Sequence, residues 1–375
     1  MTKLICNRCV MDNESDKTFV LDKSGFCNYC TDTLTRMSKE YFPNGRGRKM
    51  LDELMDRIKK DGAGRQFDCM VGVSGGVDSS YVLYLGYKYG LRMVAVHIDD
   101  GLDTDVATEN IRNVCLKTKT ELMTVKPPDL NQYKDLIRAF FLARVPNVAM
   151  PQDNIIASAS NDAAKRYRVM YNLSGGNFAL ECILERNTGV NALDTKHIRA
   201  IHKMFGCGSI SALRLATFFE EYIHGRYLNK VSKILPLNFI DYNLKTAIRE
   251  LAAFCDYQYY GGKHHESRLT RFLQCYYLPV KYRFDKRKSH FSSMIVSGQM
   301  TRAEALAELA KEPYLNEQLK NDDFNFLADY QAMSRKEFDD LLAMPPKFHH
   351  DYPVSQMNNF AGLARKFRKY LGTSG

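Results

Sequence analysis

Two serines and two glycines occur together in a pattern that could bind phosphate. The stretch Asp68–Ser80 reads DCMVGVSGGVDSS, an apolar run that stops at Ser74 and then continues with helical spacing. A strand, a glycine turn and a helix start present free backbone N–H groups and the positive end of a helix to an anion. Gly75 and Gly76 let a phosphate approach the backbone, and Ser74 and Ser79 add hydroxyl donors. The sequence therefore predicts a phosphate-binding loop.

Asp78 is an unexpected residue in an anion site, because its carboxylate would repel phosphate. A divalent cation that accompanies the phosphates removes this conflict, so Asp78 is a candidate Mg²⁺ ligand, directly or through water. The loop is not a Walker loop, because the GxxxxGK[ST] spacing and its lysine are absent. The alternative is a Gly-Gly turn that only connects two elements.

Four of the ten cysteines are patterned for metal binding. Cys6 and Cys9 form one CxxC pair, and Cys27 and Cys30 form a second pair 17 residues later. Two such knuckles complete a tetrahedron of thiolates with no open position, so they predict a structural zinc ribbon. A redox CxxC is the alternative. The other cysteines are expected to be small buried hydrophobic residues: Cys69, Cys115, Cys182, Cys207, Cys255 and Cys275.

Apolar strands that alternate with helices follow the phosphate loop. Strands are predicted at Arg92–Ile98, Glu121–Val125 and Val169–Leu173. This alternation predicts an α/β fold with a parallel sheet, in which ligands bind at the carboxyl ends of the strands. The polar clusters Asp99–Gly101 and Ser174–Asn177 fall at such ends, as the phosphate loop does. Residues 190–260 read as mainly helical, and Pro43–Gly47 reads as a linker.

Composition limits the class of protein. The 375 residues are 45% apolar and 26% charged, with no apolar run long enough to span a membrane and no secretory signal. A cytoplasmic protein is expected. The net charge of +10 fits RNA binding, attraction of anionic nucleotides or acidic sugars, or a surface excess without function.

The loop sequence S-G-G-x-D-S resembles the signature of the PP-loop ATP pyrophosphatases. That resemblance implies cleavage of ATP between its α and β phosphates. AMP is transferred to a substrate oxygen, and a nitrogen or sulfur nucleophile then displaces it.

Three further motifs resemble the N-acetyl sugar amidotransferase family. They are the CxxCVMD opening, the FxxDxxGxCNYC second knuckle and the DKRKxHxSSxIxSGQMTRxEAL segment. The resemblance runs from Cys6 to about Leu309. It implies conversion of a sugar acetamido group to an acetamidino group in bacterial surface-glycan synthesis, with ATP, Mg²⁺ and Zn²⁺. The sugar would be a pseudaminic or legionaminic type of acid, or an acetamido hexose or uronate.

The same resemblance implies the ammonia-supplying partners, and the residue pattern predicts the domains. Ammonia would come from a glutaminase subunit and a barrel partner similar to the halves of imidazole-glycerol-phosphate synthase, while nucleic acid and membranes are not expected partners. The predicted fold is a Rossmann-like PP-loop domain with an N-terminal zinc ribbon and a mostly helical C-terminal part. The predicted segments are the ribbon, 1–45, the PP-loop domain, 46–260, and the basic C-terminal region, 261–375.

Residues at strand ends and in the basic C-terminal region are predicted to form the site. The predicted catalytic residues are Asp78, Asp153, Asn177, Glu181, Lys263 and Glu266. The predicted ATP- and pyrophosphate-binding residues are Val73, Ser74, Gly75, Gly76, Asp78, Ser79, Asp99, Gly101, Gly175, Gly176, Lys286 and Arg287. The predicted substrate-binding residues are His265, Arg271, Arg283 and His290. The predicted metal ligands are Cys6, Cys9, Cys27 and Cys30 for zinc and Asp78 for magnesium.

Several of these residues have a structural alternative. Asp153 is also a good helix N-cap. Asn177 and Glu181 are also compatible with a turn and a helix start, and the basic residues from Lys281 to Lys288 with a solvated surface. The histidines His264 and His265 with Glu266 could form a second metal site, although adjacent histidines point in different directions on most backbones.

The adenosine contacts depart from the family pattern. The chain has Asp100 and Leu102 where the family often has Asn and Trp. His97, just inside the strand, is interpreted as a strand-end histidine with satisfied hydrogen bonds.

Other functions use the same residues. A tRNA-modifying PP-loop enzyme would bind RNA phosphates with the basic residues, although Cys182 and Cys207 form no obvious pair for thiolation. A nucleotide-sensing scaffold and an amidotransferase that acts on an ordinary carboxylate are further alternatives.

Overall fold

The computed structural model describes residues 3–186, 189–220 and 231–356. The chain forms two compact units. The first comprises Met1–Lys126, Asp162–Asn187 and Asn229–Leu327, and the second comprises Pro127–Asn161, Thr188–Leu228 and Ala328–Gly375. The ribbon segment and most of the C-terminal region thus belong to the same unit as the phosphate loop. The predicted domain boundaries at residues 45 and 260 therefore stay a prediction.

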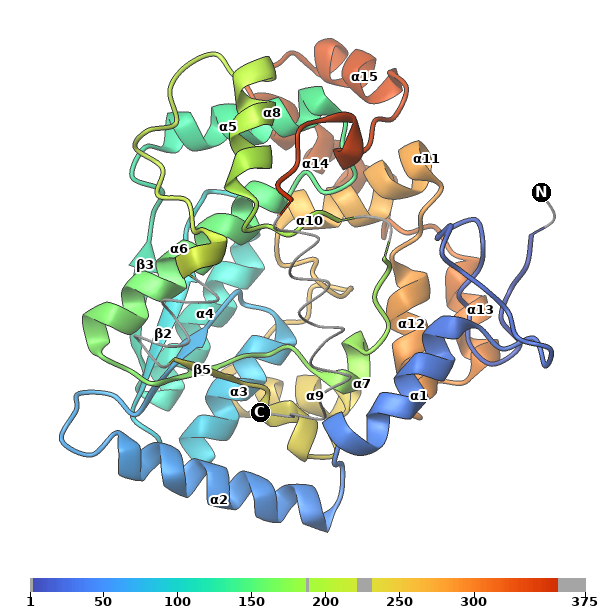
Figure 1. The fold of residues 1–375 in the computed structure, drawn as a ribbon. Helices are drawn as coiled ribbons and strands as arrows, with labels where there is room; N and C mark the ends of the chain where they lie inside the picture. The colour runs from blue at the N-terminus through green and yellow to red at the C-terminus, as the bar shows by residue number, and fades with distance from the viewer. Residues whose placement is uncertain (1–2, 187–188, 221–230, 357–375) are drawn as a thin grey trace. The chain divides into compact units, whose positions relative to one another are not determined.

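The first unit is built on a five-stranded parallel sheet with the order β3-β2-β1-β4-β5 (Figure 1). The strands are β1 Cys69–Gly72, β2 Met93–Ile98, β3 Glu121–Val125, β4 Tyr171–Leu173 and β5 Ser232–Ile234. The parallel α/β fold predicted from the sequence is confirmed. Strand β5 lies within a region predicted to be mainly helical, and that prediction was wrong there. This edge strand reads SKI and is largely exposed, so it carries no apolar signal.

Helices cover both faces of the sheet. On one face, α3 (Val77–Lys88), α4 (Asp105–Thr118) and α9 (Leu244–Cys255) pack together, and their apolar side chains share a core with β1. On the other face, Val94 and Val96 pack against Ala163 and Ala164. Val71 of β1 pairs with Ala95 of β2 and with Leu173 of β4, so these parallel strands end within a few residues of one another. The loops that follow them therefore meet at one edge of the sheet.

The segment Pro43–Gly47 is not a linker, which corrects the sequence interpretation. Helix α1 spans Asn28–Glu40, and α2 spans Gly45–Asp61, so the two glycines lie in the first turn of α2. Asn44 caps α2 by accepting hydrogen bonds from the backbone N–H groups of its first turn. A Cβ at Gly47 would lie 1.8 Å from the carbonyl oxygen of Phe42, so glycine is required for close packing.

The C-terminal part is helical, as predicted. A continuous helical stretch comprises α10 (Arg268–Phe272), a π-helical turn (Leu273–Tyr277) and α11 (Leu278–Tyr282). The helices that follow are α12 Arg287–Val296, α13 Arg302–Leu309, α14 Glu317–Tyr330 and α15 Arg335–Ala343. Helix α13 begins with the predicted capping box between Thr301 and Glu304.

The second unit is helical where the structure describes it. Its main elements are α5 Leu130–Ala143, most of α6 Met150–Tyr167, α8 Thr195–Phe205, α15 and a 3₁₀ turn His349–Asp351. Helices α5 and α8 pack together, with Phe140 in edge contact with the ring of His197. Among the described residues, none of the helices has the length and apolar character needed to cross a bilayer.

Candidate active site

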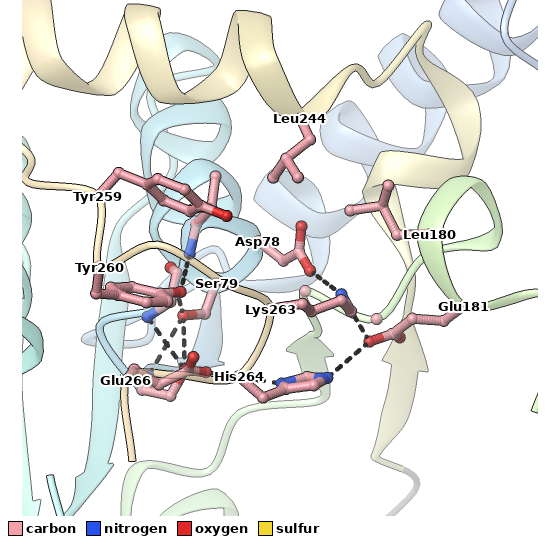
Figure 2. Close-up of a pocket in the computed structure, with 16 residues that line it drawn as sticks. Asp78, Ser79, Leu180, Glu181, Leu244, Tyr259, Tyr260, Lys263, His264 and Glu266 are labelled. Carbon is pink, nitrogen blue, oxygen red and sulfur yellow. Dashed lines mark hydrogen bonds and ion pairs between the residues drawn. The ribbon is translucent and has the colours of Figure 1, made fainter. Parts of the chain in front are cut away.

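A cavity of about 190 Å³ opens where the loops after β1 and β4 meet segment 259–266 (Figure 2). Strand β1 lies between β2 and β4, so the cavity is at the point of the sheet where strand order reverses, which is the usual ligand site in this architecture. The polar lining residues are Ser74, Asp78, Ser79, Tyr259, Tyr260, Glu181, Lys263, His264 and Glu266. Gly76, Gly175, Gly176 and Gly262 and the apolar side chains of Val77, Leu180 and Leu244 complete the wall.

The loop after β1 has the shape of a phosphate cradle. Gly75 has a φ of +75°, and a Cβ there would lie 2.3 Å from the carbonyl oxygen of Ala107, so only glycine fits. The hydroxyl oxygens of Ser74 and Ser79 are 3.4 Å apart. Gly76 is the N-cap of α3 and provides no side-chain cap, so an anion can bind the N–H groups of the first turn.

Two tyrosines hold the backbone of the cradle from segment 257–260. The Tyr257 hydroxyl donates to the carbonyl oxygen of Gly75 at 2.9 Å, and the Tyr260 hydroxyl accepts from the backbone N–H of Val77 at 3.2 Å. Burial raises the pKa of both phenols, so both are neutral. The loop is thus fixed in its shape by neutral groups.

Lys263 links two carboxylates beside the cradle (Figure 2). Its ammonium lies 2.7 Å from Asp78 Oδ2 and 3.0 Å from Glu181 Oε1. Burial disfavours the charged form of Glu181, but His264 and Lys263 nevertheless hold the pKa of its carboxyl group well below the ordinary value. Burial also opposes the charge of Lys263, yet the two carboxylates raise its pKa above the ordinary value. The other oxygen of Asp78 accepts a hydrogen bond from the Tyr242 hydroxyl.

His264 lines the cavity, and it is absent from the catalytic and substrate residues predicted from the sequence. Its ring lies between two carboxylates, with Nε2 3.6 Å from Glu181 and Nδ1 3.8 Å from Glu266. Burial alone would lower its pKa, but these carboxylates raise it to about 9, so the ring is charged at neutral pH. The residue has a φ of +62°, a left-handed conformation that is uncommon outside glycine. No simple sequence pattern reveals this conformation.

Glu266 reaches the cradle from the start of α10. Its Oε1 accepts from the Ser74 hydroxyl at 3.1 Å, and its backbone carbonyl accepts from the N–H of Thr104 at 2.9 Å. Asp103 and Ser267 form a β-bridge beside it. The loop after β2 therefore holds the Glu266 backbone against the phosphate loop.

The loop after β4 completes the site. A Cβ at Gly175 would lie 2.7 Å from the backbone nitrogen of Ser79, so this glycine allows the two loops to touch. Asn177 caps α7 (Phe178–Glu181) by accepting from the N–H of Leu180, and its own N–H donates to Glu181 Oε2 at 3.4 Å. Asn177 therefore positions Glu181 but does not itself line the cavity.

Several predicted residues lie outside the cavity lining. Val73, Asp99 and Gly101 follow β1 and β2 but are not among the lining residues, and Asp99 pairs with Lys126 at 3.2 Å. Asp153 belongs to the second unit. It lies in the first turn of α6, which begins at Met150, so it is not the N-cap of that helix.

His97 is the strand-end histidine that its position predicted. Its ring bonds the carbonyl oxygen of Val73 through Nδ1 and Asp103 through Nε2, both at 3.2 Å.

The predicted substrate residues are mostly engaged within the protein. His265 turns its Nε2 to the sulfur of Cys275 at 3.3 Å, and Arg271 forms two hydrogen bonds with Asp323. Arg283 ends α11 in a left-handed conformation. His290 is buried with its ring centroid 5.6 Å from that of His264, so it supports the site from behind. None of these four residues lines the cavity.

Arg283 of the basic segment is exposed, whereas the basic residues from Lys286 to Lys288 are paired within the protein, and none of the segment lines the cavity. Lys286 pairs with the buried Glu185 at 2.6 Å, and Lys288 pairs with Asp12 of the ribbon. Arg287 pairs with Asp285 and also donates to carbonyl groups at the end of α13. These charges join segments of the first unit together.

The four patterned cysteines form a cluster that can hold a metal ion. All four are fully buried, and their sulfur atoms lie within 4.8 Å of one another. Nearest sulfur pairs are 3.5 to 3.7 Å apart. A tetrahedral zinc site with Zn–S bonds of about 2.3 Å has sulfur atoms about 3.8 Å apart, so the donor set fits. The other cysteines are buried as expected, except Cys207, which is exposed and corrects that expectation.

The fold and the site together define a class of protein. The parallel sheet with an SGGVDS loop at its reversal point, the N-terminal four-cysteine cluster and the helical C-terminal part are those of a PP-loop protein with an added four-cysteine segment. Residues 266–366 match the family described as "LPS biosynthesis protein WbpG-like, C-terminal domain". The match contains the DKRKxHxSS motif, so over this region the family model agrees with the resemblance predicted from the sequence.

Two solved structures show distant similarity. One is the NH3-dependent NAD synthetase from Campylobacter jejuni in complex with the nitrate ion, at 16% identity, over 42% of this chain and 72% of that chain, with a TM-score of 0.29. The other is the NMN synthetase from Francisella tularensis, at 11% identity, over 55% of this chain and 92% of that chain, with a TM-score of 0.29. At these scores the similarity carries no functional argument. No curated protein matches the chain.

Proposed function

We propose that the protein is an ATP-dependent amidotransferase that converts the acetamido group of a sugar to an acetamidino group. The observation that carries the proposal is the junction of a phosphate cradle with an ion-paired wall, Lys263 with Asp78 and Glu181, in one cavity. The family description of the C-terminal region, LPS biosynthesis, supports a glycan precursor as the substrate. The sugar would be an N-acetylated nonulosonic acid or an acetamido hexose or uronate.

The chemistry proceeds in two steps. The acetamido oxygen attacks the α-phosphorus of ATP, the bond to the bridging oxygen breaks, and pyrophosphate leaves. Ammonia then adds to the activated carbon, one of its protons passes to a base, and the C–O bond to AMP breaks. Preorganised donors and cations that stabilise the charge developing on the phosphates are the main catalytic contribution expected here.

The residues of the cavity have distinct roles in this reaction. Ser74, Ser79 and the first-turn N–H groups of α3 hold the departing pyrophosphate. Lys263 supplies positive charge at the wall next to the cradle, and Glu181 is the candidate base. Mg²⁺ would neutralise phosphate charge when it is bound, and carboxylates of the cavity are the groups that fit it.

We further propose that the four-cysteine cluster holds zinc in a structural role. The backbone carbonyl groups of Cys6 and Cys9 accept hydrogen bonds from Arg302, and Thr33 donates to the carbonyl of Cys182 at the end of α7. The ribbon thus supports the helix that carries Glu181. Exhaustive chelation should release about one zinc per chain and weaken ribbon packing, which metal analysis and near-UV circular dichroism would detect. Absence of zinc from protein purified without chelator would contradict this role.

Ammonia is proposed to come from a glutaminase and a barrel-type partner. This part of the proposal rests on the family resemblance alone. Activity with free ammonium in the absence of any partner would show that the chain itself carries out both steps.

The test incubates the protein with ATP, Mg²⁺, ammonium and a panel of acetamido sugars. AMP should form with the correct sugar, and the product should be about one mass unit lighter because NH replaces O. The matched control is Asp78→Ala, which should lose AMP formation. Formation of ADP, or a product of amide mass from a carboxylate, would contradict the proposal.

A further inference from the structure

Glu266 places a carboxylate inside a site built for anions. Its Oε1 lies 3.1 Å from the Ser74 hydroxyl and would lie 2.8 Å from a Cβ at Gly76. The carboxylate therefore lies against the two residues that would bind the pyrophosphate. The pairing of Asp103 with Ser267 and the hydrogen bond from Thr104 hold its backbone in this position.

The three carboxylates of the cavity differ in how their oxygens are used. Both oxygens of Asp78 are engaged, by Tyr242 and Lys263. Both oxygens of Glu181 are engaged as well, by the cations at one and by a backbone N–H at the other. Glu266 Oε2 is buried and has no hydrogen-bond partner within the described ranges of the chain.

An unpartnered buried carboxylate oxygen is costly, because it has lost water without gaining a donor. The Glu266 side chain is only 10% exposed, so water does not satisfy it from the surface. His264 and Ser74 overcome the effect of burial and hold the pKa of Glu266 below its ordinary value, so the group is an anion at neutral pH. A second anion in the cradle, the diphosphate of ATP, would repel it strongly. A cation between the two removes both problems.

We propose that Glu266 Oε2 is a ligand of a divalent cation that bridges this carboxylate to the diphosphate of ATP. The inference rests on the proposed function only in requiring that ATP binds in the cradle. A hard cation with oxygen ligands, Mg²⁺ in the cell, fits a site made of a carboxylate and phosphates. Asp78, predicted from the sequence as the Mg²⁺ ligand, instead uses its oxygens to hold Lys263 and Tyr242 in this structure.

The test uses Glu266→Gln, which keeps the size of the side chain and an acceptor for Ser74 but removes the charge. Binding of Mn²⁺ is measured by electron paramagnetic resonance with α,β-methylene-ATP, an analogue that cannot be cleaved between its α and β phosphates. The full-length variant should bind Mn²⁺ at least about ten-fold more weakly than the natural protein in this complex. Glu308→Gln, an exposed change on α13, is the matched control and should bind as the natural protein does.

Two results would overturn the proposal. One is equal Mn²⁺ affinity in Glu266→Gln and the natural protein. The other is tighter binding of α,β-methylene-ATP by Glu266→Gln than by the natural protein at saturating Mn²⁺, which would show that Glu266 only occupies the cradle until ATP displaces it.

A structural measurement covers the case in which the variant does not fold. Crystals of the natural protein with Mn²⁺ and the analogue should show an anomalous peak about 2.1 Å from Glu266 Oε2. A peak away from Glu266 would overturn the proposal. None of these assays contains sugar or ammonia, so a failure of the amidotransferase reaction would leave the cation result standing on its own.

Discussion

The half-buried His264 and the buried pair of His197 and His349 carry opposite charge states. In the first unit, His264 lies between Glu181 and Glu266, and its pKa is raised to about 9. In the second unit, burial lowers the pKa of His349 to about 3 and also lowers the pKa of His197. The comparison teaches that the partners of a buried imidazole decide its charge: carboxylates hold the proton on, and neutral acceptors do not.

His197 and His349 form a short hydrogen-bonded chain of neutral groups. His197 Nδ1 bonds the carbonyl oxygen of Pro353 at 2.9 Å, and its Nε2 bonds His349 Nδ1 at 2.8 Å. The other nitrogen of His349 accepts from the backbone N–H of Asn147 at 3.4 Å. Each ring thus donates once and accepts once, so an added proton would break one of these bonds. This pair stabilises the unit only while both rings are neutral.

The largest effect is expected from Lys263→Met, which removes the ammonium group that Asp78 and Glu181 share. Two half-buried carboxylates would be left with less compensation, so the free energy of unfolding should fall by about 3 kcal/mol and AMP formation by about 100-fold. Urea denaturation and an AMP assay measure the two effects. Lys311→Met, a change of an exposed lysine, is the control. Retention of both stability and AMP formation would show that the ion pairs of Lys263 with Asp78 and Glu181 are not needed for folding or for the reaction.

The second prediction concerns stability at acid pH and the neutral pair. Because the folded pKa of His349 lies below its unfolded value, the stabilisation is complete above pH about 6.5 and is lost as the pH falls towards 3. The loss should be about 1.4 kcal/mol per pH unit for one such histidine. His349→Gln should flatten this acid limb in urea melts, and His350→Gln, at an exposed neighbour, should not. An unchanged slope in His349→Gln would contradict the neutral assignment.

The smallest effect is expected at alkaline pH and has the opposite sign. The folded pKa of His264 is raised, so its contribution is complete below pH about 6.5 and is lost as the pH rises through 9. The change should be modest, because 38% of the His264 side chain is exposed and solvent screens its charge. His264→Asn should flatten the alkaline limb, and it should also reduce the acid-limb stabilisation from Glu181 and Glu266, because His264 lowers the pKa of both carboxyl groups. An unchanged alkaline limb in this variant would mean that the ring is neutral in the folded protein.

The sequence predicted those parts of the site that depend on local pattern. The phosphate loop, the polar strand ends and the two CxxC knuckles are short motifs whose geometry is set within a few residues. The structure brings the phosphate loop together with the strand end at Ser174–Asn177, but Asp99–Gly101 does not line the cavity. The choice between His264 and His265 depends on one left-handed backbone conformation, which spacing does not reveal. The role of the basic segment was not predictable for a different reason. Lys286 and Lys288 pair with residues far away in the sequence, Glu185 and Asp12, which local patterns do not reveal.

The hydrogen bonds from Arg302 to the carbonyl groups of Cys6 and Cys9 make the two ends of the first unit mutually dependent. Val10 adds a bond to Ser292, and Lys288 reaches Asp12, so the knuckles and α12 provide each other's polar partners. A shortened chain that starts after the knuckles would leave these groups buried without partners. The packing of the knuckles is therefore complete only after nearly three hundred further residues have been synthesised.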